Sequence, residues 1–308
     1  MERCGERPAR RWGAALIASA AAVAVALPAT TAEAASGPSV AGAKGAFLLD
    51  SGSNRQLWSK DADTKRQMAS TTKVMTATVV LDTRGVDLNK KVTIKQSYRD
   101  YVARNGASTA DLRTGDKMTV RQLLYGLLLP SGCDAAYALA DTFGSGSTEA
   151  ERTRSFIAKM NKKASDLGMK NTKYDSFDGI SPSGANYTTP RDSAQLARHA
   201  IDNSTFSTVV KTTGTQQTAA NVKRTYYWDN TNKLLGSYKG AIGIKTGTGT
   251  AAGPCLVFAA KRDGRTVVGV ILNDAADRYP DAVKMLDWAY RTKTSVKLRQ
   301  LPESAQQD

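Results

Sequence analysis

Apolar and polar residues alternate near both ends of the chain, and this pattern predicts two β-hairpins. The first hairpin pairs residues 45–50 with residues 55–59 across a turn rich in serine. The second pairs residues 255–260 with residues 266–272 across a turn that contains Gly264. Shorter extended segments are predicted at 226–228 and 241–245.

Between the hairpins the apolar residues recur with the period of a helix. Helices are predicted over residues 68–82, 120–129, 135–143 and 155–167, and from the capping segment 189–192 onward. Pro130 ends the second of these helices because proline lacks an amide hydrogen, and Asp134 is the expected N-cap of the third. Ser131 and Cys133 are therefore expected in a sharp bend between two apolar helices. From Val209 onward the pattern favours strands.

This order of elements predicts a mixed α/β (α+β) fold in which both ends of the chain contribute to one antiparallel sheet flanked by helices. We expect the sheet-containing subdomain to comprise residues 44–66 and 206–291. Residues 67–205 are expected to form a mostly helical subdomain beside it. Residues 35–43 are expected to be a linker and residues 292–308 a polar tail.

The first 34 residues have the three-part layout of a secretory signal peptide. Four arginines precede an apolar run over residues 14–27, and Pro28 and the small-residue site 32–34 follow it. Residues 1–34 are thus expected to direct export and to be removed, with an uncleaved anchor as the alternative. The polar tail predicts no C-terminal anchor, so we expect a secreted protein or one associated with the cell wall or the outer face of the membrane.

The chain carries a formal net charge of +15, which falls by one unit if the signal segment is removed. For an exported protein this charge favours an anionic wall polymer or a membrane surface as a partner, although it can also serve solubility alone. Nucleic acid is excluded because the basic residues are scattered and no recognition motif accompanies them. We expect a monomer.

Few residues suited to metal or redox chemistry remain after removal of the signal segment. Cys133 and Cys255 are interpreted as two thiols rather than a disulfide, because each lies in a segment with another use. A single histidine, His199, predicts neither a zinc site nor a Ser-His-Asp triad, and is expected on the surface of its helix. We therefore expect no metal and no cofactor.

The first candidate for chemistry is Ser70-Thr71-Thr72-Lys73, at the start of a predicted buried helix. Residues three apart share a helix face, so the Ser70 hydroxyl and the Lys73 amine can meet. A serine needs a neighbouring proton acceptor to become a nucleophile. Burial at a helix N-terminus would lower the pKa of Lys73 toward neutrality and so make it an acceptor. Since chance also supplies Ser-x-x-Lys segments, other segments must decide.

Two further segments carry polar groups that could join this pair. Ser131-Gly132-Cys133 lies in the predicted bend, which would hold its side chains rigidly away from the core. Lys245-Thr246-Gly247-Thr248 lies on a glycine-rich strand, where glycine marks close approach by a ligand or another backbone. A cationic Lys245 beside such an edge could hold a substrate carboxylate. Each segment taken alone is also compatible with an ordinary turn.

The three segments together resemble the signature set of penicillin-binding proteins and class A β-lactamases. Over residues 44–291 the chain resembles the low-molecular-weight penicillin-binding proteins, the serine-type D-alanyl-D-alanine carboxypeptidases and transpeptidases. Residues 130–134 are similar to the corresponding segment of small secreted actinomycete DD-transpeptidases. Further family-like stretches are residues 177–179, Tyr187 and residues 189–192. The resemblance implies a β-lactamase/penicillin-binding-protein-like fold and a role in peptidoglycan biosynthesis and cell shape.

The resemblance also implies a role for each candidate residue. Ser70 would attack the carbonyl between the two D-alanines of a peptidoglycan stem peptide, form an acyl-enzyme, and be acylated by β-lactams as covalent inhibitors. Lys73 would accept the serine proton, and Ser131 would relay a proton to the leaving amine. Lys245 would help to hold the terminal carboxylate. Backbone amides of Ser70 and Thr248 would form the oxyanion hole, and the substrate site would include Cys133, Thr246, Gly247 and Thr248.

The sequence departs from the family at Cys133, where most members carry asparagine. A thiol is a weak donor and cannot hold a substrate amide as asparagine can, so we hypothesise that Cys133 lines the cleft as a free thiol. A β-lactamase-like hydrolase is the alternative enzyme, but neither Glu149 nor Glu151 begins the Glu-x-x-Leu-Asn run expected of the water-activating glutamate. Two alternatives are not enzymes: a non-catalytic penicillin-recognising wall sensor and a plain adhesive wall protein. Neither would give the three segments a role in catalysis.

Overall fold

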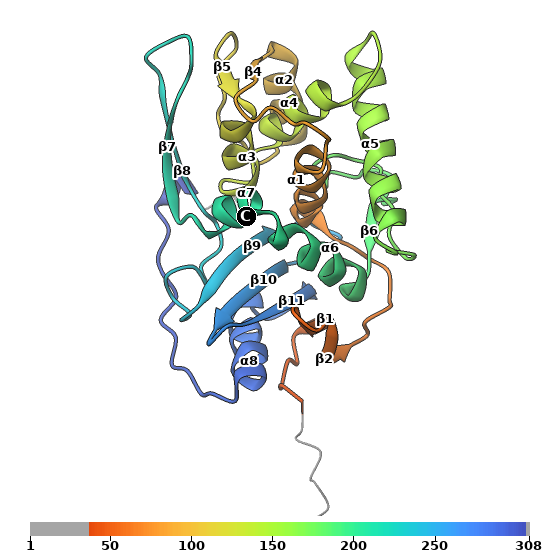
Figure 1. Ribbon diagram of the computed structural model, residues 1–308, viewed down its shortest axis with the longest axis vertical. Helices are drawn as coiled ribbons and strands as arrows, with labels where there is room; N and C mark the ends of the chain where they lie inside the picture. Colours follow the sequence, from red (N-terminus) through yellow and green to blue (C-terminus); the bar gives the residue numbers. More distant parts are fainter. Residues whose placement is uncertain (1–36, 306–308) are drawn as a thin grey trace, which may run out of the picture. The chain divides into compact units, whose positions relative to one another are not determined.

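The computed structural model describes residues 37–305, in which a five-stranded antiparallel sheet is the central element (Figure 1). The strands lie in the order β2-β1-β11-β10-β9, so both ends of the described chain build one sheet, as the alternation predicts. Both predicted hairpins are confirmed, because β1 pairs with β2 and β10 pairs with β11. The bounds are β1 (Ala43–Asp50), β2 (Arg55–Lys60), β9 (Ala241–Gly247), β10 (Cys255–Arg262) and β11 (Arg265–Asp274).

The side chains of this sheet alternate between two apolar cores, since successive residues of a strand point to opposite faces. Phe47 and Val270 belong to the core that the sheet shares with most helices, whereas Leu48 and Ile271 belong to a smaller core on the other face. Helix α8 (Arg278–Tyr290) fills the smaller core. Helices α6 (Pro190–Asp202) and α7 (Ser204–Lys211) cover the larger one.

Helix α1 (Lys73–Leu81) lies inside the larger core, and all of its residues are buried. A helix that is buried all round must be enclosed by other elements, and helices α3, α4, α5, α6 and α7 contact it. The other helices are α2 (Gln96–Asn105), α3 (Val120–Leu128), α4 (Cys133–Phe143), α5 (Glu149–Asp166), η1 (Ala69–Thr72) and η2 (Glu303–Ala305). Three small antiparallel pairs complete the described part: β3 (Arg66–Gln67) with β6 (Tyr187–Thr188), β4 (Lys91–Thr93) with β5 (Lys117–Thr119), and β7 (Gly214–Thr218) with β8 (Thr225–Asp229).

Two predictions of where elements begin are wrong. The chain does not turn to strands at Val209, because residues 204–211 form α7, where Phe206, Val209 and Val210 share one buried side and Asn203 caps the first amides. Helix α5 begins at Glu149 rather than at residue 155, because Thr148 and Glu151 form a capping box.

The division into a sheet-containing and a helical subdomain stays a prediction. The predicted signal segment 1–34 lies outside the described residues, as do residues 35–36 of the linker and the last three residues of the tail. Within residues 37–305, no helix has the length and apolar character needed to cross a membrane.

Candidate active site

Ser70 and Lys73 meet where η1 runs into α1. Lys73 Nζ donates to Ser70 Oγ at 2.9 Å and to the Asp178 carbonyl at 3.0 Å. Lys73 has no exposed surface. The turn before it is held by hydroxyls, since Thr71 Oγ1 donates to the Met68 carbonyl and Thr72 Oγ1 to the Ala69 carbonyl. A hydroxyl and an amine are therefore in contact within one buried turn, which is the arrangement that a serine nucleophile and its proton acceptor require.

The loop of residues 176–180 presses the Asp178 carbonyl against Lys73. Gly179 allows this approach, because a Cβ there would lie 2.1 Å from the Ala69 carbonyl oxygen, and its φ of +104° suits only glycine. The Asp178 carboxylate is anchored separately: it accepts from Tyr101 Oη at 2.8 Å and from the Ile180 amide at 3.0 Å. The Asp178 side chain thus fixes the loop, while the Asp178 carbonyl faces the Lys73 amine.

Ser131 lies in the predicted bend between α3 and α4 with its side chain buried. Its φ is +66°, a left-handed conformation that non-glycine residues seldom adopt. The bend is fixed by three hydrogen bonds: the Gly132 amide donates to the Gly126 carbonyl, the Cys133 amide to the Ser108 carbonyl, and Ser108 Oγ to the Ser131 carbonyl. Within the described residues, Ser131 Oγ has no hydrogen-bond partner. Strain and an unpaired hydroxyl in a rigid bend are features of functional sites.

Asp134 is not the N-cap of α4, because that position belongs to Gly132. The buried Asp134 carboxylate instead accepts from the Ala110 and Leu112 amides at 2.9 Å and from Thr109 Oγ1 at 2.9 Å. It thereby ties the loop 109–112 to the start of α4. Tertiary hydrogen bonds outweigh the local capping preference that predicted its role.

Cys133 connects the bend to the Ser70-Lys73 pair. Its thiol lies 3.7 Å from Ser108 Oγ and interacts with Lys73. Burial raises the pKa of this thiol to about 12, although the nearby Lys73 acts to lower it. Cys255 is also a buried free thiol, so the predicted absence of a disulfide between them is confirmed. The proposed role of Cys133 in lining the cleft stays a hypothesis.

Strand β9 brings the Lys245-Thr246-Gly247 segment against Ser70. A Cβ at Gly247 would lie 3.0 Å from the Ser70 amide, so the absence of a side chain lets the two backbones approach. Lys245 and Thr246 are both buried, and Thr246 Oγ1 lies 2.6 Å from Thr231 Oγ1. The Lys245 ammonium donates to the Thr246 carbonyl at 3.0 Å. Thr248 follows directly, at the end of the strand.

Arg278 is a site residue that the sequence analysis misses. Its guanidinium donates to the Gly247 carbonyl at 2.8 Å, to Thr248 Oγ1 at 2.9 Å and to the Cys255 carbonyl at 3.1 Å. It therefore positions the end of β9 beside Ser70. No local pattern marks it, because it reaches the site from the first turn of α8.

His199 lies away from this centre. Its Nε2 is 2.7 Å from Asp82 Oδ2, at the C-terminal end of α1, and its side chain is 38% exposed. The nine residues of α1 separate Asp82 from the Ser70 end by about 13 Å, at 1.5 Å of rise per residue. Among residues 37–305 no cluster of three or more His, Cys, Asp or Glu side chains is arranged to hold a metal ion.

Comparison with known proteins gives consistent matches. Residues 30–276 match the family model described as D-alanyl-D-alanine carboxypeptidase. A D-alanyl-D-alanine carboxypeptidase of Streptomyces sp. strain K15 is 50% identical over 288 residues, which cover 91% of this chain and 98% of that protein. A second relative, D-alanyl-D-alanine carboxypeptidase DacB2 of Mycobacterium tuberculosis, is 32% identical and covers 79% of this chain and 81% of its own length.

Two crystal structures share the fold. The Streptomyces K15 DD-transpeptidase superposes with a TM-score of 0.81 at 52% identity, covering 83% of this chain and 99% of that one. A D-alanyl-D-alanine carboxypeptidase from Mycobacterium tuberculosis superposes with a TM-score of 0.72 at 30% identity, covering 86% of this chain and 96% of that one. These matches confirm the predicted penicillin-binding-protein-like fold.

Proposed function

This chain belongs to the family of D-alanyl-D-alanine carboxypeptidases, serine-type enzymes that bind penicillin, and we propose that four of its side chains carry the reaction: Ser70, Lys73, Ser131 and Lys245. The observation that carries this proposal is the 2.9 Å contact between Lys73 Nζ and Ser70 Oγ inside a buried turn. The unpaired hydroxyl of Ser131 and the approach of β9 to the Ser70 amide support it.

In the proposed acylation step, Ser70 Oγ attacks the carbonyl carbon between the two D-alanines while Lys73 accepts the hydroxyl proton. The amides of Ser70 and Thr248 hold the oxyanion, which is a large electrostatic contribution in acyl transfer. Ser131 passes its proton to the leaving nitrogen and takes up the proton held by Lys73, so the amide bond breaks, D-alanine departs with a neutral amino group and its carboxylate, and an ester remains on Ser70. Water or an amine then attacks this ester and regenerates the serine.

The substrate carboxylate has a separate set of proposed partners. Lys245 supplies the positive charge, and the hydroxyls of Thr246 and Thr248 lie on the same strand end, which Gly247 keeps close to Ser70. Arg278 holds this strand end through Thr248 and the Gly247 carbonyl. Cys133 would line the part of the site that holds the acyl group transferred to Ser70, and its thiol would be a weak hydrogen-bond donor there.

Fast hydrolysis of a penicilloyl ester is disfavoured because no glutamate of the intervening segment is placed to activate water. Glu149 accepts from Lys95 at 3.0 Å, and Glu151 forms the capping box of α5. Both therefore serve the helical region rather than the site. This supports the peptidase over a β-lactamase-like hydrolase, and the contact between Ser70 and Lys73 disfavours a non-catalytic sensor.

The proposed setting of the reaction is outside the cytoplasm. The expected export segment 1–34, the substrate D-Ala-D-Ala stem peptide and the charge of +15 all suit a monomer working near anionic wall polymers.

Release of D-alanine from a D-Ala-D-Ala peptide, with and without glycylglycine as an acceptor, tests the proposal. Wild-type protein should release D-alanine in both reactions and form a second peptide product only with the acceptor. Ser70→Ala should lose both products while keeping its thermal unfolding temperature. Release of D-alanine by folded Ser70→Ala at the wild-type rate would rule out Ser70 as the nucleophile.

A further inference from the structure

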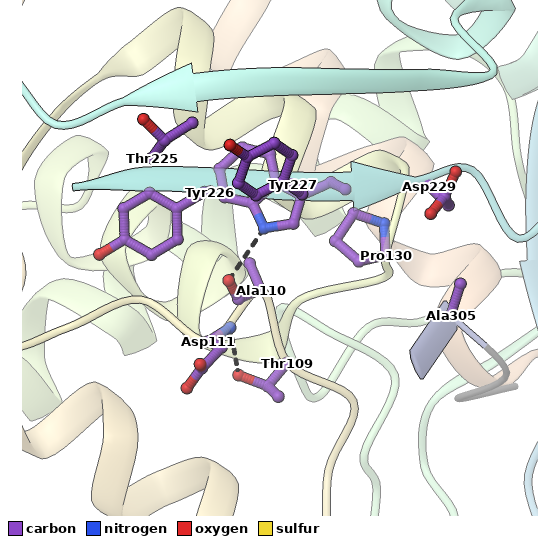
Figure 2. A pocket seen from close by; sticks show the side chains of 10 residues that line it. Thr109, Ala110, Asp111, Pro130, Thr225, Tyr226, Tyr227, Asp229 and Ala305 are labelled. Carbon is purple, nitrogen blue, oxygen red and sulfur yellow. Dashed lines mark hydrogen bonds between the residues drawn. The ribbon is translucent and has the colours of Figure 1, made fainter. Parts of the chain in front are cut away.

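A cavity of about 470 Å³ lies beside the bend that carries Ser131, and the proposed mechanism uses none of the side chains that line it (Figure 2). Its walls come from the loop 109–111, from Pro130, from strand β8 and from Ala305 near the C-terminal end of the described chain. Pro130 directly precedes Ser131. At the other wall, Trp228 lies three residues before Thr231, whose hydroxyl contacts Thr246 of the active-site strand. Two walls of the cavity are therefore continuous in the chain with segments of the proposed catalytic centre, one with Ser131 and the other with the partner of Thr246.

A second hollow, of about 340 Å³, lies along the same hairpin and shares Tyr227, Trp228 and Asp229 with the first. Its opposite wall comes from β7, where Gly214 pairs with Asp229. A Cβ at Gly214 would lie 3.1 Å from Asp229 Oδ1, so the missing side chain keeps this hollow open. Because the two hollows share Tyr227, Trp228 and Asp229, we refer to them together as the groove along β8, and each is within the size range of small-ligand sites.

Tyr227 is the exposed aromatic side chain of this groove. The inward residues of β8, Tyr226 and Trp228, are buried and stack with ring centroids 5.6 Å apart, and Trp228 Nε1 donates to the Ala110 carbonyl at 2.9 Å. Tyr227 lies between them and is 69% exposed. In the part of the chain that the structure describes, Val222, at 42%, is the only other large apolar side chain that is exposed. A rigid strand thus presents one aromatic ring to a ligand.

The polar groups of the groove favour a neutral ligand rich in hydroxyls. Asp111 and Asp229 supply carboxylate oxygens, and each has a cation near it: Asp111 pairs with Arg113 at 2.5 Å, and the charge of Asp229 acts on the half-buried Arg299 without an ion pair between them. A carboxylate near a cation still accepts hydrogen bonds from hydroxyls, whereas it attracts an ammonium group less strongly. Hydroxyl and amide groups complete the lining, from Thr109, Thr225 and Gln216.

We propose that the groove along β8 binds the sugar rings of the glycan strand from which the substrate stem peptide extends. A sugar ring packs its C–H face on an aromatic ring such as Tyr227 and places its hydroxyls toward acceptors at its rim. This inference rests on the proposed function, because the glycan is brought to the groove by its attached peptide. The attacked carbonyl belongs to the fourth residue of a five-residue stem, so the proposal requires the sugar site to lie within about 14 Å of Ser70.

The test compares Tyr227→Ala with Tyr227→Phe and with Val222→Ala, an exposed control on the same hairpin. Binding is measured by titration with chitotetraose, followed through tryptophan fluorescence. Kinetics are measured on uncrosslinked peptidoglycan and on a free D-Ala-D-Ala peptide. Tyr227→Ala should weaken chitotetraose binding about tenfold and raise KM for the polymer about tenfold, with kcat unchanged. Tyr227→Phe and Val222→Ala should match the wild type, and all variants should match it on the free peptide.

The sugar assignment is overturned if chitotetraose does not bind the wild-type protein, or if Tyr227→Ala keeps the wild-type KM on the polymer. It is also overturned if Tyr227→Ala changes the kinetics on the free peptide, because the groove would then hold peptide. Failure of the proposed function is distinguishable, since it appears as loss of penicillin acylation in the wild-type protein itself. Tyr227→Ala should fold normally because the ring it removes is exposed.

Discussion

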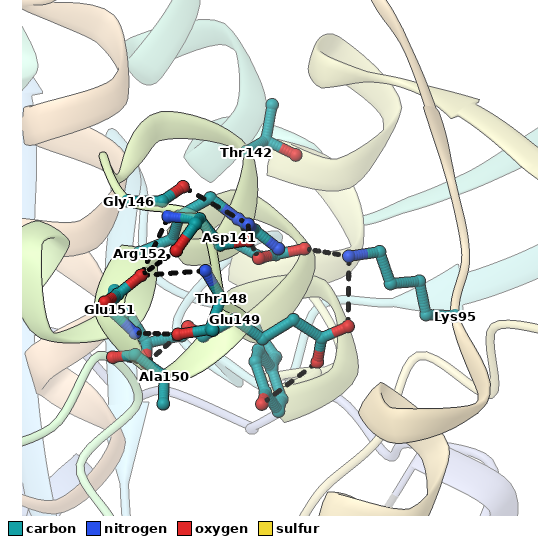
Figure 3. Close-up of polar contacts among 12 residues, drawn as sticks. Lys95, Asp141, Thr142, Gly146, Thr148, Glu149, Ala150, Glu151 and Arg152 are labelled. Atoms are coloured by element: carbon teal, nitrogen blue, oxygen red, sulfur yellow. Dashed lines mark hydrogen bonds and ion pairs between the residues drawn. The ribbon is translucent and has the colours of Figure 1, made fainter.

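Two clusters of buried polar groups in this protein differ in how fully their hydrogen-bonding capacity is used. In the first, which we call the Asp141 cluster, the Asp141 carboxylate of α4 accepts from Lys95 at 2.7 Å, Tyr98 at 2.6 Å and Arg152 at 2.6 Å (Figure 3). Lys95 also donates to Glu149 at 3.0 Å. Every charge in this cluster therefore has an opposite charge beside it.

The second cluster is the candidate active site, where compensation is incomplete. The buried Lys73 Nζ donates to two neutral oxygens, Ser70 Oγ and the Asp178 carbonyl. Ser131 Oγ has no partner among the described residues. Buried polar groups are normally paired, and exceptions gather where chemistry is done. We infer from this comparison that the Asp141 cluster serves to join α2, α4 and α5. The candidate active site instead leaves hydrogen-bonding groups available for a substrate.

The largest expected difference between the two clusters comes from replacing the lysine of each one. Lys73→Met removes the proposed proton acceptor and should slow acylation by labelled penicillin about 1,000-fold. Lys95→Met removes an ion-pair donor from the other cluster and should leave acylation unchanged while lowering stability. Stopped-flow acylation and urea unfolding measure the two effects. Wild-type acylation by a folded Lys73→Met protein would contradict the assignment of the two clusters.

Ser131→Ala should separate activity from stability at one position. Acylation should slow about 100-fold, because proton transfer to the leaving amine is impaired. The free energy of unfolding should change by less than about 0.5 kcal/mol, because the hydroxyl that is lost has no partner within residues 37–305. A large loss of stability, measured by urea unfolding, would mean that this hydroxyl is structural.

Asp141→Asn should have the opposite effects to Ser131→Ala, because it should change stability and not acylation. It leaves Lys95 and Arg152 without their shared buried carboxylate and should lower the free energy of unfolding by about 2 kcal/mol. Acylation per folded molecule should be unchanged. Glu149→Gln is the matched control at the more exposed edge of the cluster, where the loss should be below about 1 kcal/mol. Equal losses from the two variants would show that burial does not distinguish these carboxylates.

The same cluster predicts a pH dependence of stability. Burial acts to raise the pKa of Asp141, but hydrogen bonds from Lys95, Tyr98 and Arg152 outweigh it and hold the pKa below its usual value. A carboxyl whose pKa is lowered by folding stabilises the protein above its unfolded pKa of about 3.9, and this contribution is lost as pH falls through the folded pKa. Urea unfolding from pH 7 down to pH 3 should therefore show the difference between wild type and Asp141→Asn shrinking below about pH 4. A difference that stays constant over this range would contradict the lowered pKa.

The smallest expected effect concerns the reactivity of Cys133. Because burial raises the pKa of its thiol to about 12, only about one molecule in 10,000 carries the reactive thiolate at pH 8. Iodoacetamide should leave folded protein unmodified at Cys133 for hours, and should modify it readily in guanidinium chloride. Mass spectrometry of tryptic peptides measures the modification of Cys133 under both conditions. Rapid modification of the folded protein would mean that the bend opens in solution.

The sequence suffices to propose the reactive residues, because the residue types that their chemistry needs occur together in short segments. Ser70 and Lys73 are one helical turn apart, and the helix-breaking Pro130 marks the bend at Ser131. Residues that reach the site from a distance leave no such pattern. Arg278 comes from α8, and the Asp178 carbonyl contacts Lys73 only because Gly179 lets its loop approach Ala69.

Local rules fail in this chain where tertiary contacts compete with them. Asp134 has the sequence position of an N-cap, yet its carboxylate bonds to the amides of Ala110 and Leu112 from another loop. Residues 204–211 are rich in β-branched side chains that favour strands, yet packing of Phe206 and Val210 on the core makes them helical. Both errors concern residues whose partners are distant in sequence.

The most direct test of the central claim is the position and lifetime of the penicillin adduct. Intact protein and its peptides are analysed by mass spectrometry after incubation with benzylpenicillin, for wild type and Ser70→Ala. The account predicts one long-lived adduct, on the peptide that contains Ser70, and none in the folded variant. An adduct on another residue, rapid turnover of penicillin, or no adduct on folded wild-type protein would contradict it.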